Sequence, residues 1–452
     1  MSEVEYSADT IEDHYRAEHL GPPEHPRDPW VWCVAIPALF GVLASIRLTI
    51  PSIPEFDEIH YLPAAREWLT LLGDVPGQYI NPEHPPLGKQ IIALGMYLFG
   101  DEPLGWRIMS LVFGIVAVGG AMRAMWHASH DRFATIAFGI LLVTGFHLFI
   151  HARIAMLDIF MAAFLCVAAW FFASAVRKPE QGRWRLAICG AAIGLALAAK
   201  WNAIPLAMVP GLAFFAARLS AGRRRLFTST RGIPVPGISL LEAFVWLGIV
   251  PLAVYSLTYL PGAWLGNELQ PSIVAQKGLI GLHEHMYDLQ QQVVRPHPYM
   301  SSWPQWVMNT RGIWYLYEFV DGAQRGVLLI GNPVTMLLGL PAVLWCLVSG
   351  LYRSDFAKIA VVAGYAASLG FWLIAPKPIQ FYYHYIMPSC FLLGALALTL
   401  SDIWQVRKYR WISLVVLAAS VAMFAVFWKV LTAAELASVR SFLNWTWLEG
   451  WR

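Results

Sequence analysis

Long apolar runs alternate with short polar segments along most of the chain. A helix that spans a membrane needs roughly 20 mostly apolar residues. Runs of that kind begin near eleven positions: Trp30, Ile108, Phe133, Ile154, Leu186, Ala203, Leu240, Val327, Ile359, Tyr382 and Trp411. Residues 186–217 are divided into two helices around Lys200, because a charge at the centre of a bilayer is costly. The pattern therefore predicts an all-α polytopic membrane protein with about 11 transmembrane helices.

Two polar connections, residues 51–106 and 261–325, are much longer than the others. Connections of this length are usually functional or disordered. Both are rich in Trp, Tyr and His, which argues against disorder. Their amphipathic segments YLPAAREWLTLLG and VAQKGLIGLHEHMYDLQQQ predict short helices along the membrane interface. We expect an N-terminal tail (residues 1–29), a membrane domain (30–433) and a short C-terminal tail (434–452).

Basic residues cluster in alternate loops, which predicts the orientation of the chain. The clusters are Arg123 and Arg132; Arg177, Lys178, Arg183 and Arg185; Arg218, Arg223, Arg224, Arg225 and Arg231; Arg353 and Lys358; and Arg407, Lys408 and Arg410. Cytoplasmic loops carry an excess of Lys and Arg. The N-terminus is therefore expected in the cytoplasm, and both long connections and the C-terminal tail on the outer face. Residues 1–29 lack the basic start of a cleavable signal peptide, so the first span is expected to remain as an anchor.

Composition supports a chain dissolved mainly in lipid. It is 58% hydrophobic and 13% charged, whereas soluble domains are about 25% charged. The net charge of +3 is small, which argues against a nucleic-acid partner. The five cysteines lie in apolar runs, so we predict neither a disulfide nor a zinc site and treat them as small hydrophobic residues.

Charged and aromatic side chains gather in the segments predicted to lie at the outer face. Lys and Arg can hold a phosphate group, and a carboxylate can accept a proton from a hydroxyl. Aromatic side chains can stack on a sugar or line a groove for an isoprenoid. This combination fits group transfer from a lipid phosphate to a hydroxyl. A transporter would be expected to show broken helices in two matched halves, which the sequence lacks.

The order of motifs resembles that of the protein O-mannosyltransferases, a family of GT-C membrane glycosyltransferases. The motifs are DEIHY, HPPLGK, RIAMLD, AAKWN, HPYMSSWPQW, RGIWYLYE, GNP and QFYYHYIMP, between about Phe56 and Pro388. The resemblance implies a GT-C fold with eleven spans. It also implies inverting transfer of mannose from a polyprenyl-phosphate carrier to Ser or Thr of proteins. The expected location is the bacterial inner membrane, and because eukaryotic relatives pair, a dimer is a further expectation.

The resemblance also assigns roles to residues. Asp57 and Glu58 are the predicted catalytic acids, with Asp57 as the base or orienter of the acceptor hydroxyl. The predicted donor phosphate and lipid contacts are Arg107, Arg153, Lys200, Lys377, Tyr382, His384 and Tyr385. The predicted acceptor or site-shaping residues are Glu83, His84, Lys89, Asp158, His297, Tyr299 and Trp303. No cofactor or divalent metal is expected.

Two features depart from the family pattern. The family often has an acid two residues before HPPLGK, where this chain has Pro82 between Asn81 and Glu83. The soluble MIR domain of the eukaryotic second loop is missing. The chain therefore resembles a compact, bacterial-type member.

Other interpretations of the same residues stay open. Asp57 and Glu58 suit a helix cap, and Asp158 suits a buried ion pair between helices. His283 and His285 are metal-ligand types, but two residues apart on a helix they point in different directions. At the level of function, the alternatives are a GT-C enzyme with a glycan or lipid acceptor, as in aminoarabinose transfer to lipid A, and a lipid-linked sugar flippase.

Overall fold

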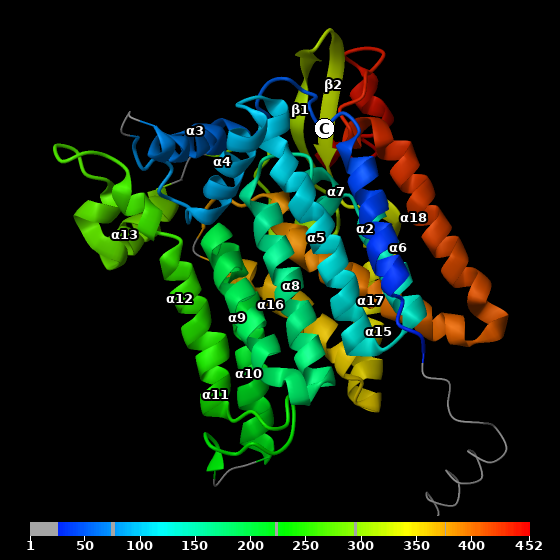
Figure 1. Cartoon of the computed structure of the whole chain (residues 1–452). Helices are drawn as coiled ribbons and strands as arrows, with labels where there is room; N and C mark the ends of the chain where they lie inside the picture. The colour runs from blue at the N-terminus through cyan, green and yellow to red at the C-terminus, as the bar shows by residue number, and fades with distance from the viewer. Residues whose placement is uncertain (1–25, 74–76, 222–224, 293–295, 376) are drawn as a thin grey trace, which may run out of the picture.

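The computed structural model describes residues 26–73, 77–221, 225–292, 296–375 and 377–452 (Figure 1). Most of the predicted tail 1–29, and Arg223 and Arg224 of the predicted basic loop, lie outside these ranges. The helices are α2 (Trp30–Ser45), α3 (Glu58–Leu69), α4 (Leu87–Phe99), α5 (Pro103–Ser129), α6 (Arg132–Thr144), α7 (His147–His151), α8 (Leu157–Arg177), α9 (Gly182–Ala199), α10 (Ile204–Ala221), α11 (Leu240–Phe244), α12 (Val250–Leu257), α13 (Ile273–Gln292), α14 (Trp303–Val307), α15 (Pro333–Arg353), α16 (Phe356–Ile374), α17 (Ile386–Gln405) and α18 (Arg410–Leu431). The strands are β1 (Ile313–Val320) and β2 (Ala323–Leu329).

The chain is an integral membrane protein built as a bundle of apolar helices. In the part that the structure describes, nine helical stretches are long and apolar enough to cross a membrane. Each of the eleven predicted segments contains a helix, but α2 and α6 are shorter than these nine stretches. The count of eleven spans therefore stays a prediction.

The centre of the bundle is formed by α5, α8, α9 and α17. α5 packs along α8, and α8 packs along α9. Gly120 of α5 allows this close approach, because a Cβ there would lie 3.1 Å from the backbone carbonyl carbon of Cys166 on α8. Small residues at such crossings are typical of helices packed in membranes.

A β-hairpin, which the sequence analysis did not predict, stands at one end of the bundle (Figure 1). β1 pairs antiparallel with β2 through a two-residue Asp321-Gly322 turn, in which both residues have positive φ. Asp-Gly is the preferred sequence for such a turn. The predicted helix starting near Val327 is wrong over residues 327–329, because they pair with β1 and α15 begins only at Pro333. We call this end of the bundle the hairpin end, and the opposite end the far end.

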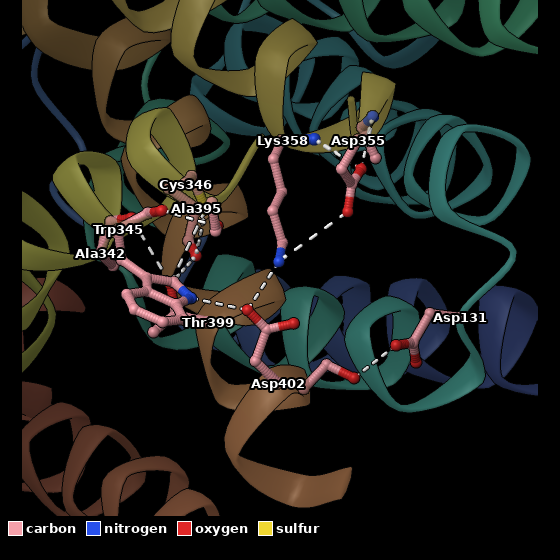
Figure 2. Close-up of polar contacts among 12 residues, drawn as sticks. Asp131, Ala342, Trp345, Cys346, Asp355, Lys358, Ala395, Thr399 and Asp402 are labelled. Atoms are coloured by element: carbon pink, nitrogen blue, oxygen red, sulfur yellow. Dashed lines mark hydrogen bonds and ion pairs between the residues drawn. The ribbon is translucent and has the colours of Figure 1, made fainter. Parts of the chain in front are cut away.

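A polar network joins α15, α16 and α17 at the far end (Figure 2). The Lys358 ammonium lies 2.6 Å from an Asp402 carboxylate oxygen, and the indole N–H of Trp345 donates to the same oxygen at 2.6 Å. Asp355 accepts hydrogen bonds from the first backbone N–H groups of α16. Lys358 is buried, and a buried charge persists where it is paired. The network therefore links α15 and α17 to the start of α16.

Candidate functional site

The candidate site lies at the hairpin end, where both long connections fold over the bundle. The first connection forms α3 and α4, and the second forms α13, α14 and the hairpin (Figure 1). A cavity of about 510 Å³ lies beneath them. Lys200, Lys377 and His84 contribute to its lining, so we call it the cationic cavity.

Lys200 forms a buried ion pair with Asp158. Its ammonium nitrogen lies 2.7 Å from Asp158 Oδ2, and both side chains are almost fully buried. Lys200 sits in extended conformation between α9 and the short helical turn that follows, while Asp158 is in the first turn of α8. The second carboxylate oxygen of Asp158 has no hydrogen-bond partner among the described residues. The ammonium also lies 4.9 Å from the ring centroid of Tyr383, a cation–π distance.

Asp57 belongs electrostatically to the same group of charges. Burial raises the pKa of the Asp57 carboxyl above its ordinary value; Asp158 also raises it, whereas Lys200 and Lys377 oppose the shift. Burial, together with the charge of Lys200, lowers the pKa of Lys377 to about 8. A carboxylate of raised pKa beside two cations suits a general base next to an anion site.

Phe56 fixes the backbone that leads into Asp57. Its φ is +47°, an uncommon value for a residue with a side chain. Aromatic rings from three other segments surround the Phe56 ring. The centroid distances are 4.7 Å to Tyr315, 6.2 Å to His297, 6.1 Å to Phe381 and 6.1 Å to Tyr383. Strained backbone persists where the surroundings hold it and is concentrated at functional sites.

Glu58 and Arg107 form a buried, bidentate ion pair directly behind Asp57. Arg107 Nε donates to Glu58 Oε1 at 2.9 Å, and Nη2 donates to Oε2 at 2.8 Å. The remaining guanidinium N–H groups donate to the backbone carbonyls of Leu48, Pro51 and Ile53. No guanidinium N–H is left for a phosphate, and Arg107 is absent from the lining of the cationic cavity. The predicted phosphate contact of Arg107 therefore disagrees with its geometry, which instead ties the first connection to α5.

Arg153 likewise supports the backbone. Its guanidinium donates to the carbonyls of Ala44, Ile46 and Arg47 at the end of α2. Carbonyls at a helix C-terminus lack partners within the helix. Arg153 does not line the cationic cavity, so its geometry also differs from the predicted phosphate contact.

The HPPLGK segment folds around Lys89. The buried Lys89 ammonium donates to the backbone carbonyls of Asn81 at 2.5 Å and His84 at 2.8 Å. This places His84 in the wall of the cationic cavity. The Glu83 backbone carbonyl accepts from Gln290 of α13 at 2.7 Å. Lys89 therefore shapes the loop, while Glu83 joins it to the second connection.

Residues 382–385 form a buried turn before α17. Tyr382 donates to the Asn309 side chain at 2.7 Å, and Tyr385 shares a hydrogen bond with Tyr365. His384 stacks on Trp372, a lining residue of the cavity, at a centroid distance of 3.9 Å. Of the predicted donor contacts in this segment, only His384 packs directly on the cavity wall.

The three predicted acceptor residues of the second connection are at least partly exposed. His297 is exposed and Tyr299 is half-buried, and their rings lie 5.8 Å apart. Trp303, at the start of α14, is 37% exposed. His297 alone of the three contacts the Phe56 ring. These side chains are available to a ligand that approaches from the hairpin end.

An aromatic wall of the cationic cavity was missed from the sequence. Trp201, Tyr255 and His283 line the cavity together. His283 Nε2 lies 2.5 Å from the Tyr255 hydroxyl, which also accepts from Trp201 Nε1 at 2.9 Å. Tyr315 and Tyr383 were missed as well. Their motifs RGIWYLYE and QFYYHY were recognised, but spacing does not tell which ring of an aromatic run faces a cavity.

The described ranges contain no group of three or more His, Cys, Asp or Glu side chains that could hold a metal ion. Both nitrogens of His283 already have partners, Tyr255 and the backbone carbonyl of Leu279. The expectation that no divalent metal takes part stays a prediction.

Two family models match the sequence. One is described as dolichyl-phosphate-mannose-protein mannosyltransferase and matches residues 83–248. The other is described as the C-terminal four-transmembrane region of protein O-mannosyltransferase and matches residues 275–451. Together they account for more than half of the chain.

Curated relatives and solved structures agree with these models. A polyprenol-phosphate-mannose–protein mannosyltransferase of Mycolicibacterium smegmatis is 27% identical over 493 residues, covering 94% of this chain and 93% of the relative. A relative of the same name from Mycobacterium tuberculosis is 27% identical and covers 90% and 88%. The protein O-mannosyltransferase complex of S. cerevisiae bound to the sugar donor superposes with a TM-score of 0.77 at 13% identity, covering 94% and 92%. ArnT of Cupriavidus metallidurans bound to undecaprenyl phosphate gives 0.58 at 14% identity, covering 92% and 78%. The structural likeness shows a GT-C fold.

Proposed function

We propose a mechanism from the premise that this chain belongs to the protein O-mannosyltransferase family and is a glycosyltransferase. The donor is a polyprenyl-phosphate-mannose, and the acceptor is a Ser or Thr hydroxyl of a protein. The observation that supports the mechanism is that Lys200 and Lys377 both line the cationic cavity. Asp158 is paired with Lys200, and Asp57 interacts electrostatically with both lysines.

The reaction is a single displacement at the anomeric carbon. Asp57 accepts the proton of the acceptor hydroxyl as its oxygen attacks the anomeric carbon, and the bond from that carbon to the phosphate oxygen breaks. The bonding electrons leave with the polyprenyl phosphate, whose added negative charge is stabilised by Lys200 and Lys377. Cations placed where charge develops lower the barrier. Attack opposite the leaving group inverts the anomeric centre.

Asp158 keeps Lys200 in place. The ion pair holds the ammonium at the cavity wall in the absence of donor, so little reorganisation is needed when phosphate binds. The Lys200 ammonium has further donors for the phosphate, since an ammonium has three. Lys377 lies in the connection between α16 and α17, a few residues after the end of α16, and supplies the second positive charge.

We further propose that the hairpin end faces outward from a bacterial inner membrane, with the N-terminus in the cytoplasm. Basic loops such as those after α8, α15 and α17 lie at the far end, away from the cavity. Their excess of Lys and Arg suits a cytoplasmic face. Acceptors would then be secreted or membrane proteins. Association into a dimer is a separate proposal, and we assign no contact surface to it.

The test is a transfer assay with purified protein in nanodiscs, labelled polyprenyl-phosphate-mannose and a Ser/Thr-rich peptide. The mechanism is supported if the label appears on the peptide and the anomeric configuration of the transferred mannose is opposite to that in the donor. Label on a glycan or lipid but not on the peptide would favour the alternative acceptor class. Movement of intact donor across the bilayer without transfer would favour a flippase.

A further inference from the structure

Tyr61 lies on α3 one helical turn beyond Asp57, and its hydroxyl is free to bind a ligand. The backbone N–H of Tyr61 donates to the Asp57 carbonyl at 3.2 Å, and residues four apart lie on the same face of a helix. The Tyr61 side chain is 3% exposed. Among the described residues its hydroxyl makes no hydrogen bond, yet it is not one of the enclosed atoms that lack a partner. The exposed part of the side chain therefore includes the hydroxyl.

The Tyr61 hydroxyl interacts electrostatically with the candidate base and with the acid that holds Lys200. Burial raises the pKa of Tyr61 well above its ordinary value, and Asp57 and Asp158 are among the groups that raise it further. The hydroxyl therefore stays neutral throughout the physiological pH range. A neutral phenol can donate one hydrogen bond and accept others, so Tyr61 can pair with a group that is itself both donor and acceptor.

The Tyr61 ring is held against the wall of the cationic cavity. Its centroid lies 5.9 Å from that of His84, with one ring edge-on to the other, and His84 lines the cavity. The buried Lys89 ammonium fixes this wall by donating to the His84 carbonyl at 2.8 Å. The hydroxyl of Tyr61 therefore has a defined position without a hydrogen bond of its own.

The proposed reaction brings the hexose of the donor to this hydroxyl. Lys200 and Lys377 line the cationic cavity, whereas Asp57 and Tyr61 do not. A donor whose phosphate is held by the two lysines must extend its hexose out of the cavity toward Asp57, because the anomeric carbon has to come within reach of the acceptor oxygen there. The hexose then lies between the base and the Lys200–Asp158 pair, and both of these acids act on Tyr61.

We propose that the Tyr61 hydroxyl forms a hydrogen bond with a hydroxyl of the transferred hexose and so contributes to the selection of the sugar. This inference rests on the proposed function, since it takes the phosphate to be held by Lys200 and Lys377. A site that pairs with a hydroxyl of its substrate discriminates against analogues that lack this hydroxyl. The competing assignment is a hydrogen bond from Tyr61 to the Asp57 carboxylate, which would act on the base and not on the sugar.

The test is a double-mutant cycle between Tyr61→Phe and the sugar, because such a cycle isolates the coupling between two groups. The mannosyl donor is compared with analogues that each lack one hydroxyl, at C2, C3, C4 or C6. The control is Tyr79→Phe, the same change in the same connection, at a hydroxyl that also lacks a partner but is enclosed by protein. The ratio kcat/KM is measured with one acceptor peptide, and donor affinity is measured without the peptide.

Tyr61→Phe removes a hydroxyl that has no protein partner, so the variant should be as stable as wild type. We expect it to lower kcat/KM for the mannosyl donor by about tenfold, the effect of one hydrogen bond. This loss should disappear for the analogue that lacks the hydroxyl paired with Tyr61 and should persist for the other analogues. Tyr79→Phe should match wild type with every donor.

Two results would overturn the proposal. One is wild-type kinetics of Tyr61→Phe with every donor. The other is an equal loss with every donor, and a shift in the acidic limb of the pH profile would then assign Tyr61 to Asp57. If wild type transfers no sugar from any donor, the proposed function fails, and the same cycle measured on donor affinity decides whether Tyr61 contacts the hexose.

Discussion

Phe56 and Tyr315 pack with ring centroids 4.7 Å apart, although one precedes the candidate base in the first connection and the other lies on β1 of the hairpin. Tyr315 is also in contact with α7 of the bundle, because its hydroxyl lies 3.3 Å from Nε2 of His151. His151 Nδ1 lies 2.7 Å from the His147 carbonyl, so the tautomer that donates from Nδ1 leaves Nε2 to accept from Tyr315. The hairpin thereby sets the position of Asp57.

Replacing Phe56 should impair turnover more than binding. Phe56→Ala keeps the unfavourable φ but removes the ring that the neighbouring aromatic residues hold. A displacement of about 1 Å at a reacting group can cost about a hundredfold in rate. We expect kcat to fall by one to two orders of magnitude, roughly, with KM for the donor little changed. Phe319→Ala, at an exposed ring of the same hairpin, is the control, and an equal loss of kcat there would contradict the positioning role.

Arg107 should matter for folding rather than for donor affinity. Arg107→Lys retains the charge but cannot reproduce the bidentate pair with Glu58 or the bonds to three carbonyls. Breaking a buried pair costs about 3–5 kcal/mol. We expect a large loss of thermal stability in detergent, with donor affinity of the surviving folded protein near that of wild type. A stable Arg107→Lys protein with weakened donor binding would restore Arg107 as a phosphate contact.

The pH dependence of kcat/KM should have two limbs. Transfer needs Asp57 ionised and Lys377 protonated. The raised pKa of Asp57 places the acidic limb above the ordinary Asp range, and activity falls as pH drops through it. The pKa of Lys377, about 8, places the alkaline limb there, and activity falls as pH rises through it. Lys377→Arg should move the alkaline limb upward because a guanidinium stays protonated. An unchanged alkaline limb would exclude Lys377 as its source.

The Lys200–Asp158 pair should behave as a coupled unit. Either Lys200→Met or Asp158→Asn leaves a buried polar partner uncompensated, at a cost of about 3–5 kcal/mol in stability. The double variant should lose less than the sum of the two. The exposed pair of Arg66 and Asp101 is the control, and Asp101→Asn should cost no more than about 1 kcal/mol. Additive losses at Lys200 and Asp158, measured by unfolding in detergent, would contradict the coupling.

Much of this architecture follows from local sequence. Apolar runs predicted the helical membrane domain, and amphipathic patterns predicted α3 and α13, because both signals depend on residues close together in the chain. The hairpin was missed although Asp321-Gly322 is a recognisable turn signal. In the sequence, the apolar residues at the end of β2 run on almost directly into those of α15, so the pattern resembles that of one long helix.

The composition of the site was harder to predict than its location. Asp57, His84, Lys200 and Lys377 were expected near one another, since each lies in a motif predicted for the same face. His84, Lys200 and Lys377 line one cavity, and the site roles of all four residues stay predictions. Arg107 and Arg153 were expected beside them for the same reason. Arg107 and Arg153 instead donate their guanidinium hydrogen bonds to backbone carbonyls of residues 44–53. The path of this backbone depends on the fold, so the spacing of motifs in the sequence does not predict these contacts.

The most direct test of the mechanism is a comparison of Asp57→Asn with wild type. Asparagine keeps the size of the side chain and one acceptor oxygen but cannot accept the proton. Donor binding and single-turnover transfer to a Ser/Thr-rich peptide would be measured on the same preparations in nanodiscs. The mechanism predicts near-normal donor affinity with transfer reduced by at least about a hundredfold. Transfer at the wild-type rate by Asp57→Asn would contradict the assignment of Asp57 as the base.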